Sequence, residues 1–312
     1  MSNQEVNDRI DAVDASSGHL QSSQALPVLS ISDLLVAYDT KVVLNHINLS
    51  LRAGELIGMI GPNGAGKSTL LRTIAGLIRP QKGTITFPGL DRGDELRHRK
   101  MTKVGYVPQR FDIDPDLPLR ARDLVGLGWD GHRWGVPGPS RLRKAAVDKA
   151  LTLVDALSFA DAPCGRLSGG QLQRILIAQA MVSDPPLLLL DEPLASLDLR
   201  SADAIVEVVD RVAHETGVTV LLVTHDMNPL LRAMDRIIYV VNGNAVIGSV
   251  EDVVKKDVLG ALYGYEVEVI QVRGRILVVG DDAPVDLSGG LHHMTPRPEV
   301  PEMGSRIAEE RR

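Results

Sequence analysis

The sequence predicts an α/β fold with a mostly parallel sheet at its centre. Three predominantly apolar runs, at residues 56–61, 186–190 and 218–223, are separated by segments in which apolar residues recur with helical periodicity. Runs of this kind are typical of strands buried on both faces of a sheet, and their alternation with helices favours parallel pairing. A glycine-rich segment joins the first run to the helical segment after it.

Composition places the chain among soluble globular proteins. It has 312 residues, of which 44% are hydrophobic and 24% charged, and its formal net charge is -6. This charge gives no overall basic field, so we expect no nucleic-acid partner. The single cysteine, Cys164, cannot form an internal disulfide bond. We find neither a secretion signal nor an apolar run of the roughly 18 residues that cross a bilayer, and we expect a cytosolic protein.

The first part of the chain reads as strands followed by a helical insertion. Residues 1–26 are polar without apolar periodicity, which predicts a disordered N-terminal tail. Strand-like runs at 28–38 and 42–51 come before the first apolar strand, and a helix at 68–79 is expected to end at Pro80. After strand-like runs at 83–87 and 103–107, glycine and proline interrupt helical pieces, so we predict a helical subdomain at about 110–185.

The remaining elements complete the α/β pattern. A helix at 201–215 separates the second and third apolar strands. Two hairpins are predicted to turn at Asn242-Gly243 and Arg273-Gly274. Residues 281–312 are rich in proline, glycine and charge and predict a disordered C-terminal tail, which leaves one folded domain at 27–280.

The glycine-rich segment has the spacing of a phosphate-binding loop. Its glycines allow backbone N–H groups to curl around a phosphate, while Lys67 reaches the terminal phosphates and Ser68 offers a hydroxyl to Mg²⁺. A strand before the loop and a helix after it are the context that this motif requires. We therefore expect ATP and Mg²⁺ as ligands. The residues assigned to the loop are Gly61, Pro62, Asn63, Gly64, Ala65, Gly66, Lys67, Ser68 and Thr69.

Polar residues follow the other two apolar strands. Asp191, at the end of the strand at 186–190, is placed to hold Mg²⁺, and Glu192 is the candidate general base for the attacking water. His225 follows the strand at 218–223. Because ligands of open parallel sheets bind where strand ends converge, we expect His225 to contact the terminal phosphate. Together these residues predict ATP hydrolysis.

The motifs resemble those of the ATP-binding cassette family, the ATPase subunits of ABC transporters. Five match in order: GPNGAGKST at 61–69, YVPQR with Gln109, LSGGQ at 167–171, LLLLDEP at 187–193 and VTHD with His225. The resemblance covers about residues 27–280. It implies a P-loop NTPase cassette with a mostly parallel sheet core, an N-terminal antiparallel β part and an inserted helical subdomain.

The resemblance also implies roles for three residues whose local patterns say little. Gln109 would touch the Mg²⁺ and the attacking water, and Tyr38 would place its ring against adenine. Asp198, in the sequence Ser196-Leu197-Asp198, would lie in the family's D-loop.

The LSGGQ signature begins a helix, as the phosphate loop does, and so offers free N–H groups to an anion. By resemblance, Ser168, Gly169, Gly170 and Gln171 would touch the terminal phosphate of ATP held by a second subunit. One chain has one phosphate loop and one signature, so two sandwiched ATP molecules need two cassettes. We therefore expect a second ABC subunit as partner, in a homodimer.

Less specific stretches, at 107–128, 224–240 and 262–280, resemble the branch of the family that takes up manganese and zinc. This resemblance implies a peripheral ATPase on the cytoplasmic side of the cell membrane. Its partners would be integral membrane permease subunits and, indirectly, an extracytoplasmic metal-binding protein. The alternatives are an ABC ATPase for iron-siderophore or another small solute, and a soluble ABC ATPase without a transport role. Soluble relatives usually carry two cassettes or a long coiled coil, and neither occurs here.

Two details do not enter this assignment. His292 and His293 lie in the polar tail, and two adjacent histidines cannot by themselves close a tetrahedral metal site. Gln179 stands where the family commonly has an arginine after the signature. The substitution removes a charge without touching a nucleotide contact, so we expect activity to be retained.

Overall fold

The computed structural model describes residues 26–88, 104–114, 116–131, 140–224, 230–231, 233–263, 266–272, 275–280 and 283–286. Several predictions fall outside these residues: the N-terminal tail up to residue 25, the turn at Arg273-Gly274, and the C-terminal tail from residue 287, with His292 and His293.

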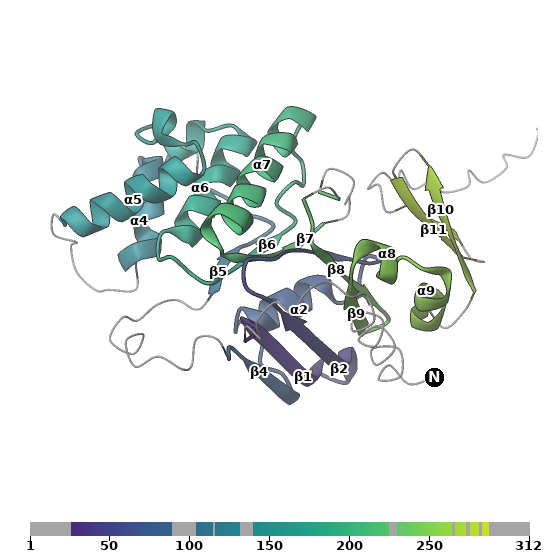
Figure 1. The fold of residues 1–312 in the computed structure, drawn as a ribbon. Helices are drawn as coiled ribbons and strands as arrows, with labels where there is room; N and C mark the ends of the chain where they lie inside the picture. The colour runs from purple at the N-terminus through teal and green to yellow at the C-terminus, as the bar shows by residue number, and fades with distance from the viewer. Residues whose placement is uncertain are drawn as a thin grey trace, which may run out of the picture.

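A six-stranded sheet runs through the centre of the molecule (Figure 1). Its strand order is β5-β6-β7-β3-β8-β9, with β9 antiparallel to β8 and the other pairs parallel. Every residue of β3, β6 and β7 is buried, as expected for strands covered on both faces. The bounds are Leu56–Ile60 (β3), Val104–Val107 (β5), Leu187–Asp191 (β6), Thr219–Val223 (β7), Arg236–Val241 (β8) and Asn244–Gly248 (β9).

One face of this sheet is covered by helix α2 (Lys67–Ile74) and by a smaller antiparallel sheet. The smaller sheet has the order β2-β1-β4, with bounds Leu29–Tyr38 (β1), Lys41–Leu51 (β2) and Lys82–Thr86 (β4). Side chains on a strand alternate between the two faces, so Leu187 and Leu189 of β6 join this core. The predicted N-terminal antiparallel part is thereby confirmed.

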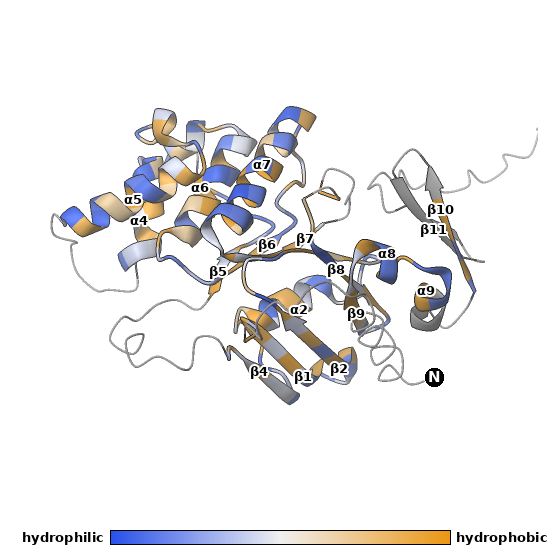
Figure 2. Cartoon of the chain, in the orientation of Figure 1, coloured by the Kyte–Doolittle hydropathy of each residue, from blue (hydrophilic) through white to orange (hydrophobic). Residues whose placement is uncertain are grey.

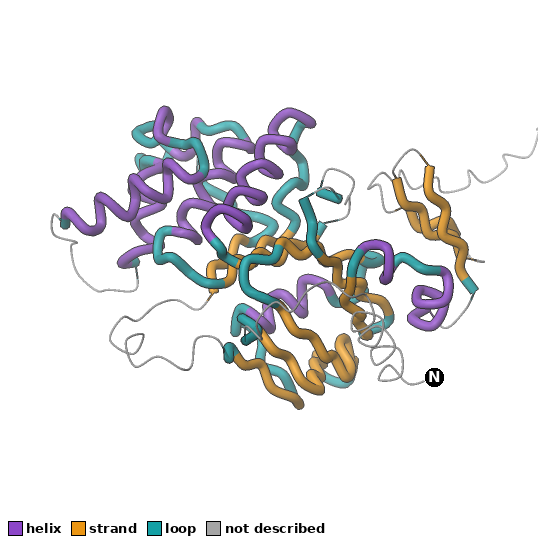
Figure 3. The backbone as a smooth tube through the Cα atoms, viewed as in Figure 1, coloured by secondary structure: helices purple, strands orange, loops and turns teal. Residues whose placement is uncertain are grey.

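Helices cover the opposite face, where Leu188 and Leu190 of β6 are buried. The helices are α4 (Ala121–Asp130), α5 (Arg141–Leu153), α6 (Gly169–Met181) and α7 (Leu199–Thr216), with short 3₁₀ turns η1 (Leu157–Phe159) and η2 (Cys164–Arg166). Figure 3 shows these helices gathered together, separate from the small antiparallel sheet. In Figure 2, α5 and α7 alternate between hydrophobic and hydrophilic residues, which is the pattern of helices with one buried face.

The chain after β7 adds the strands β8 and β9 to the central sheet and then forms a third, separate sheet. β8 and β9 are joined by a tight turn in which Asn242 and Gly243 both have positive φ, of 50° and 76°, as the sequence predicts for this hairpin. Helices α8 (Val250–Val253) and α9 (Lys256–Tyr263) follow. They lead to an antiparallel sheet of order β10-β11-β12, with bounds Val267–Val272, Arg275–Gly280 and Ala283–Asp286.

Two elements differ from the sequence prediction. Helix α2 ends at Ile74 rather than near Pro80, because the chain turns at Gly76, whose φ is 75° and whose N–H donates to Thr73 O. In the C-terminal stretch, where no order was expected from residue 281, Ala283–Asp286 pair with β11 as β12. This short segment is ordered because it pairs with β11, and the composition of the segment alone does not reveal that pairing.

A histidine near the end of α7 connects this helix to the sheet. His214 Nδ1 lies 2.8 Å from Asp210 Oδ1, and its Nε2 lies 3.2 Å from Asp235 Oδ2. Asp235 Oδ2 also accepts a hydrogen bond from the N–H of Leu56, the first residue of β3, at 2.8 Å. Burial alone would lower the pKa of His214, but the hydrogen bonds to the two aspartates outweigh it and raise the pKa above the ordinary value of a histidine.

This arrangement predicts a pH-dependent contribution to stability. A raised folded-state pKa means that the contribution is fully present below about pH 6.5 and is lost as the pH rises through the folded-state pKa. In thermal melts, His214→Gln should therefore lose more stability relative to wild type at pH 6 than at pH 8. The difference should be at most about 0.5 kcal/mol, since 42% of the side chain is exposed. A difference between the two proteins that does not change with pH would contradict this role.

Candidate functional site

The phosphate loop lies between β3 and α2 and has the backbone conformation that its glycines permit. Gly61 has a φ of 142° and Gly66 a φ of 106°. A Cβ at Gly61 would stand 1.9 Å from the carbonyl oxygen of Val240 in the neighbouring strand. Gly66 is the N-cap of α2 and provides no side-chain cap, so the first N–H groups of the helix are left for another acceptor.

Lys67, the first residue of α2, folds back over this loop. It is 5% exposed, and its Nζ donates hydrogen bonds to the carbonyl oxygens of Gly61 at 2.7 Å and Pro62 at 2.9 Å. Burial lowers the pKa of the ammonium group, while the nearby charges of Glu192 and Asp191 act in the opposite direction. The cation is thus held at the centre of the loop, between backbone carbonyls and two carboxylates.

Asp191 is the last residue of β6, and its side chain is buried. Ser68 Oγ donates to Asp191 Oδ1 at 3.1 Å, so the serine of the loop and the aspartate at the end of β6 lie side by side. Burial raises the pKa of the carboxyl group, and the hydrogen bond from Ser68 and the charge of Arg72 partly oppose this. Asp191 Oδ2 is buried without a hydrogen bond to the described residues.

Glu192 follows at a turn in the backbone, with a φ of 54°. Its N–H donates to Val223 O at the end of β7, which fixes this residue beside the neighbouring strand. Its Oε2 accepts a hydrogen bond from Gln109 Nε2 at 2.6 Å. Gln109 comes two residues after β5, so the ends of β5 and β6 bring together the candidate base and the glutamine that resemblance alone suggested.

The LSGGQ signature forms the start of α6, on the other side of the sheet from α2 (Figure 1). Ser168 and Gln171 make a capping box: Ser168 Oγ accepts from Gln171 N at 3.3 Å, and Gln171 Oε1 accepts from Ser168 N at 2.9 Å. A Cβ at Gly170 would lie 2.9 Å from the Ser201 side chain, and one at Gly169 would lie 3.3 Å from Leu197. The signature is therefore packed against the start of α7.

Asp198 belongs to this second cluster. It is the N-cap of α7, where its carboxylate accepts from Ser201 N at 3.0 Å and from Ser201 Oγ at 2.9 Å. The hydrogen bond from the backbone of Ser201 lowers the pKa of Asp198. Because Ser201 also packs against Gly170, the D-loop and the signature meet through one serine. The structure thus divides the predicted residues into two groups. The loop cluster consists of the phosphate loop at 61–69 with Gln109, Asp191 and Glu192, and the signature cluster consists of Ser168, Gly169, Gly170, Gln171 and Asp198.

The remaining predicted residues are Tyr38 and His225. Tyr38 ends β1 with 47% of its surface exposed, so its ring is open to a ligand. His225 lies outside the described residues. Thr224, just before it, is buried, and its N–H donates to Met59 O of β3 at 3.3 Å. That contact brings the end of β7 beside the strand that leads into the phosphate loop.

Sequence reasoning missed two members of the loop cluster. Arg72 Nη2 lies 3.9 Å from Asp191 Oδ2, and the side chain of Tyr106 on β5 is the main cause of a raised pKa of Arg72. A signal for Arg72 was present, since it comes four residues after Ser68 and so lies on the same face of the helix. No comparable sequence signal marked Tyr106.

The described residues contain no group of three or more histidine, cysteine or acidic side chains placed to hold a metal ion. Ser68 Oγ and the Asp191 carboxylate still fit Mg²⁺, which prefers few protein oxygens and completes its shell with water and phosphate. Asp191 Oδ2 makes no hydrogen bond to the described residues, although Arg72 Nη2 lies 3.9 Å away, so the carboxylate keeps lone pairs that such a site would use. Among the described helices, none has the length and apolar character needed to span a membrane.

The strand, glycine loop and helix, with an Asp-Glu pair on a nearby strand, define a P-loop ATPase. Comparison with known proteins narrows this class. The family model described as ABC transporter matches residues 44–195. A protein of Chlamydia trachomatis named "Probable metal transport system ATP-binding protein" is 36% identical over 243 residues, which cover 77% of this chain and 91% of that protein. The chain belongs to the ABC transporter family and is an ATP-binding cassette ATPase.

Two further comparisons agree with this family. The zinc import ATP-binding protein ZnuC of Chromohalobacter salexigens is 34% identical over 244 residues, which cover 78% of this chain and 92% of that protein. Among solved structures, a dimeric ATP-binding cassette in a post-hydrolysis state, bound to ADP and Pi, aligns with a TM-score of 0.59 and 30% identity. The match covers 71% of this chain and 98% of that one. The cassette fold predicted from the sequence is confirmed.

The loop geometry predicts how two glycines differ. Gly61→Ala would force a Cβ against a backbone oxygen, and we expect a loss of about 1–3 kcal/mol from this overlap. The matched control is Gly76→Ala, because Gly76 also has positive φ but a Cβ there meets nothing within 4 Å. It should cost only the backbone term of about 1 kcal/mol. Denaturant unfolding of both variants measures the difference, and equal losses would show that the contact with Val240 is not limiting.

Proposed function

We propose that this ATPase hydrolyses ATP at the loop cluster, with each residue in the role predicted from its motif. Lys67 and the free N–H groups of α2 bind the phosphates, and Ser68 and Asp191 hold Mg²⁺, which neutralises charge on the phosphate oxygens when bound. Glu192 accepts the proton of the attacking water, and Gln109 orients that water. His225 and Tyr38 complete the assignment as contacts to the terminal phosphate and the adenine.

The observation that carries this proposal is the position of Glu192 relative to Lys67 and Gln109. A general base must stand within hydrogen-bonding reach of the water it activates. The charge of Glu192 acts on Lys67, and its Oε2 accepts from the Gln109 amide at 2.6 Å. An amide and a carboxylate that meet beside the phosphate-binding lysine can hold a water molecule between them and the terminal phosphate.

We also propose that the functional unit is a dimer. In this chain Ser168 and Gln171 cap the start of α6, each side chain accepting a hydrogen bond from the backbone N–H of the other residue. This helix start lies on the opposite side of the sheet from α2, so the signature does not complete the chain's own loop cluster. The N-terminus of α6 still offers backbone N–H groups and a positive dipole end to an anion. A second copy would bring its signature to the ATP of the first. The dimeric state of the solved cassette supports this arrangement.

For the cargo, we propose import of a divalent metal, manganese or zinc, through integral membrane permease subunits. The support is the similarity to a protein named for metal transport and to one named for zinc import. The ATPase would then act at the cytoplasmic side of the cell membrane, with an extracytoplasmic metal-binding protein as an indirect partner. Uptake of manganese, zinc and a ferric siderophore in a deletion strain, complemented with the wild-type gene, would show which solute depends on this chain. Dependence on the siderophore alone would overturn the metal assignment.

Replacing the base tests the catalytic proposal. Glu192→Gln keeps the shape of the side chain but cannot accept a proton, so hydrolysis should fall by about 10²–10⁴-fold while ATP binding is retained. ATP should then accumulate in a closed dimer, which size-exclusion chromatography with and without ATP detects. The control is Glu207→Gln, which changes an exposed glutamate on α7. Normal turnover in Glu192→Gln would remove this residue from the role of base.

A further inference from the structure

The buried carboxylate of Asp191 faces two residues of α2 that lie one helical turn apart. Ser68 Oγ donates to Oδ1 at 3.1 Å, whereas the guanidinium nitrogen Nη2 of Arg72 lies 3.9 Å from Oδ2. Residues four apart on a helix are neighbours on the same face, so one carboxylate can contact both. Each oxygen of Asp191 therefore has its own neighbour: a hydroxyl on one side and a cation on the other.

Tyr106 of strand β5 interacts with Arg72. Its side chain has the largest of the effects that raise the pKa of Arg72. Tyr106 lies on β5, which pairs with β6 so that Tyr106 stands opposite Leu189. Burial raises the pKa of Tyr106, and Tyr106 also acts on Asp191 itself.

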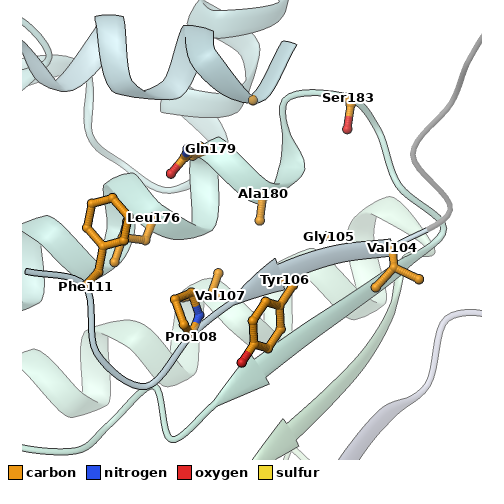
Figure 4. A pocket seen from close by; sticks show the side chains of 11 residues that line it. Val104, Gly105, Tyr106, Val107, Pro108, Phe111, Leu176, Gln179, Ala180 and Ser183 are labelled. Atoms are coloured by element: carbon orange, nitrogen blue, oxygen red, sulfur yellow. The ribbon is translucent and has the colours of Figure 1, made fainter. Parts of the chain in front are cut away.

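The side of the sheet to which Tyr106 points is set by its neighbours. In Figure 4 its ring points away from Gln179 and Ala180 of α6. Gly105 faces α6 instead, since a Cβ there would lie 2.8 Å from Ala180 O. Alternation along the strand then directs Tyr106 to the face that α2 covers, and the aromatic ring packs against that core.

We propose that Arg72 and Tyr106 are positioning residues that fix the Asp191 carboxylate for Mg²⁺ binding. This inference rests on the proposed function, in which Ser68 and Asp191 hold the metal. Tyr106 anchors the guanidinium group, the guanidinium attracts Oδ2, and Oδ1 stays directed at the Ser68 hydroxyl. Partners of metal ligands act in this way by limiting the orientations that a ligand can adopt.

The burial of Asp191 explains why its carboxylate needs residues that fix its orientation. The Asp191 side chain has 0% exposure, so water cannot orient it, while the arginine side chain is 47% exposed. An ion pair with one exposed partner is partly screened and adds little to folding stability. We therefore expect the contact to act on the geometry of the site rather than on the stability of the fold.

The test follows nucleotide binding as free Mg²⁺ is varied. A fluorescent ADP analogue is titrated in EDTA and at increasing Mg²⁺ with the wild type, Arg72→Met, Arg72→Lys and Tyr106→Phe. In Arg72→Met the Mg²⁺ concentration for half-maximal enhancement of binding should rise about tenfold, with affinity in EDTA unchanged. Arg72→Lys keeps the charge and should recover part of the effect, and Tyr106→Phe should raise the Mg²⁺ requirement about threefold.

The matched control is Arg79→Met, which changes an exposed arginine after the same helix and should leave the Mg²⁺ requirement as in wild type. An unchanged requirement in both Arg72→Met and Tyr106→Phe, with the wild type responding to Mg²⁺, would overturn the positioning role. A parallel loss of affinity in EDTA would do the same, because it would show a general effect on the fold or the nucleotide. If the wild type does not respond to Mg²⁺, the metal assignment of the proposed function fails instead.

Discussion

The site depends on one carboxylate that the sheet buries and the phosphate-loop helix contacts. Asp191 ends a strand that is buried throughout, so its side chain is removed from water. Other polar groups of the protein must therefore replace the lost hydration of the carboxylate. Those partners come from α2, as the Ser68 hydroxyl and the Arg72 guanidinium. The contact couples the phosphate-loop helix to the strand that leads into Glu192. In the proposed function, the nucleotide, the Mg²⁺ and the general base therefore all meet at the end of β6.

A second set of contacts links the signature to the D-loop on the other side of the sheet. Ser201 donates a hydrogen bond to Asp198 and packs against Gly170, so the first turns of α6 and α7 are in contact. Through His214 and Asp235, the other end of α7 contacts the start of β3, so this one helix links the D-loop to the central sheet. Under the proposed function, the chain holds two halves of a nucleotide site, one at each side of the sheet, and two copies join them.

Much of this was predictable because short-range patterns determine it. The apolar runs gave the parallel strands, and the glycines gave the loop in which Gly61 accepts the close approach of Val240 O. The end of α2 at Ile74 was missed because an isolated glycine such as Gly76 can occur inside a helix. Only its positive φ shows that the helix stops before it. Tyr106 could not be found from the sequence, because its contact to Arg72 exists only through the pairing of β5 beside β6.

The central claim is that each ATP site joins two subunits. Complementation between two inactive chains tests this claim most directly. Lys67→Ala disables the phosphate loop, and Ser168→Arg places a bulky cation in the signature. In a mixed dimer of these variants, one composite site keeps an intact loop and an intact signature from different chains. The account predicts that each variant alone is inactive and that mixing them restores ATP hydrolysis. Absence of any recovery, with mixed dimers shown to form, would contradict it.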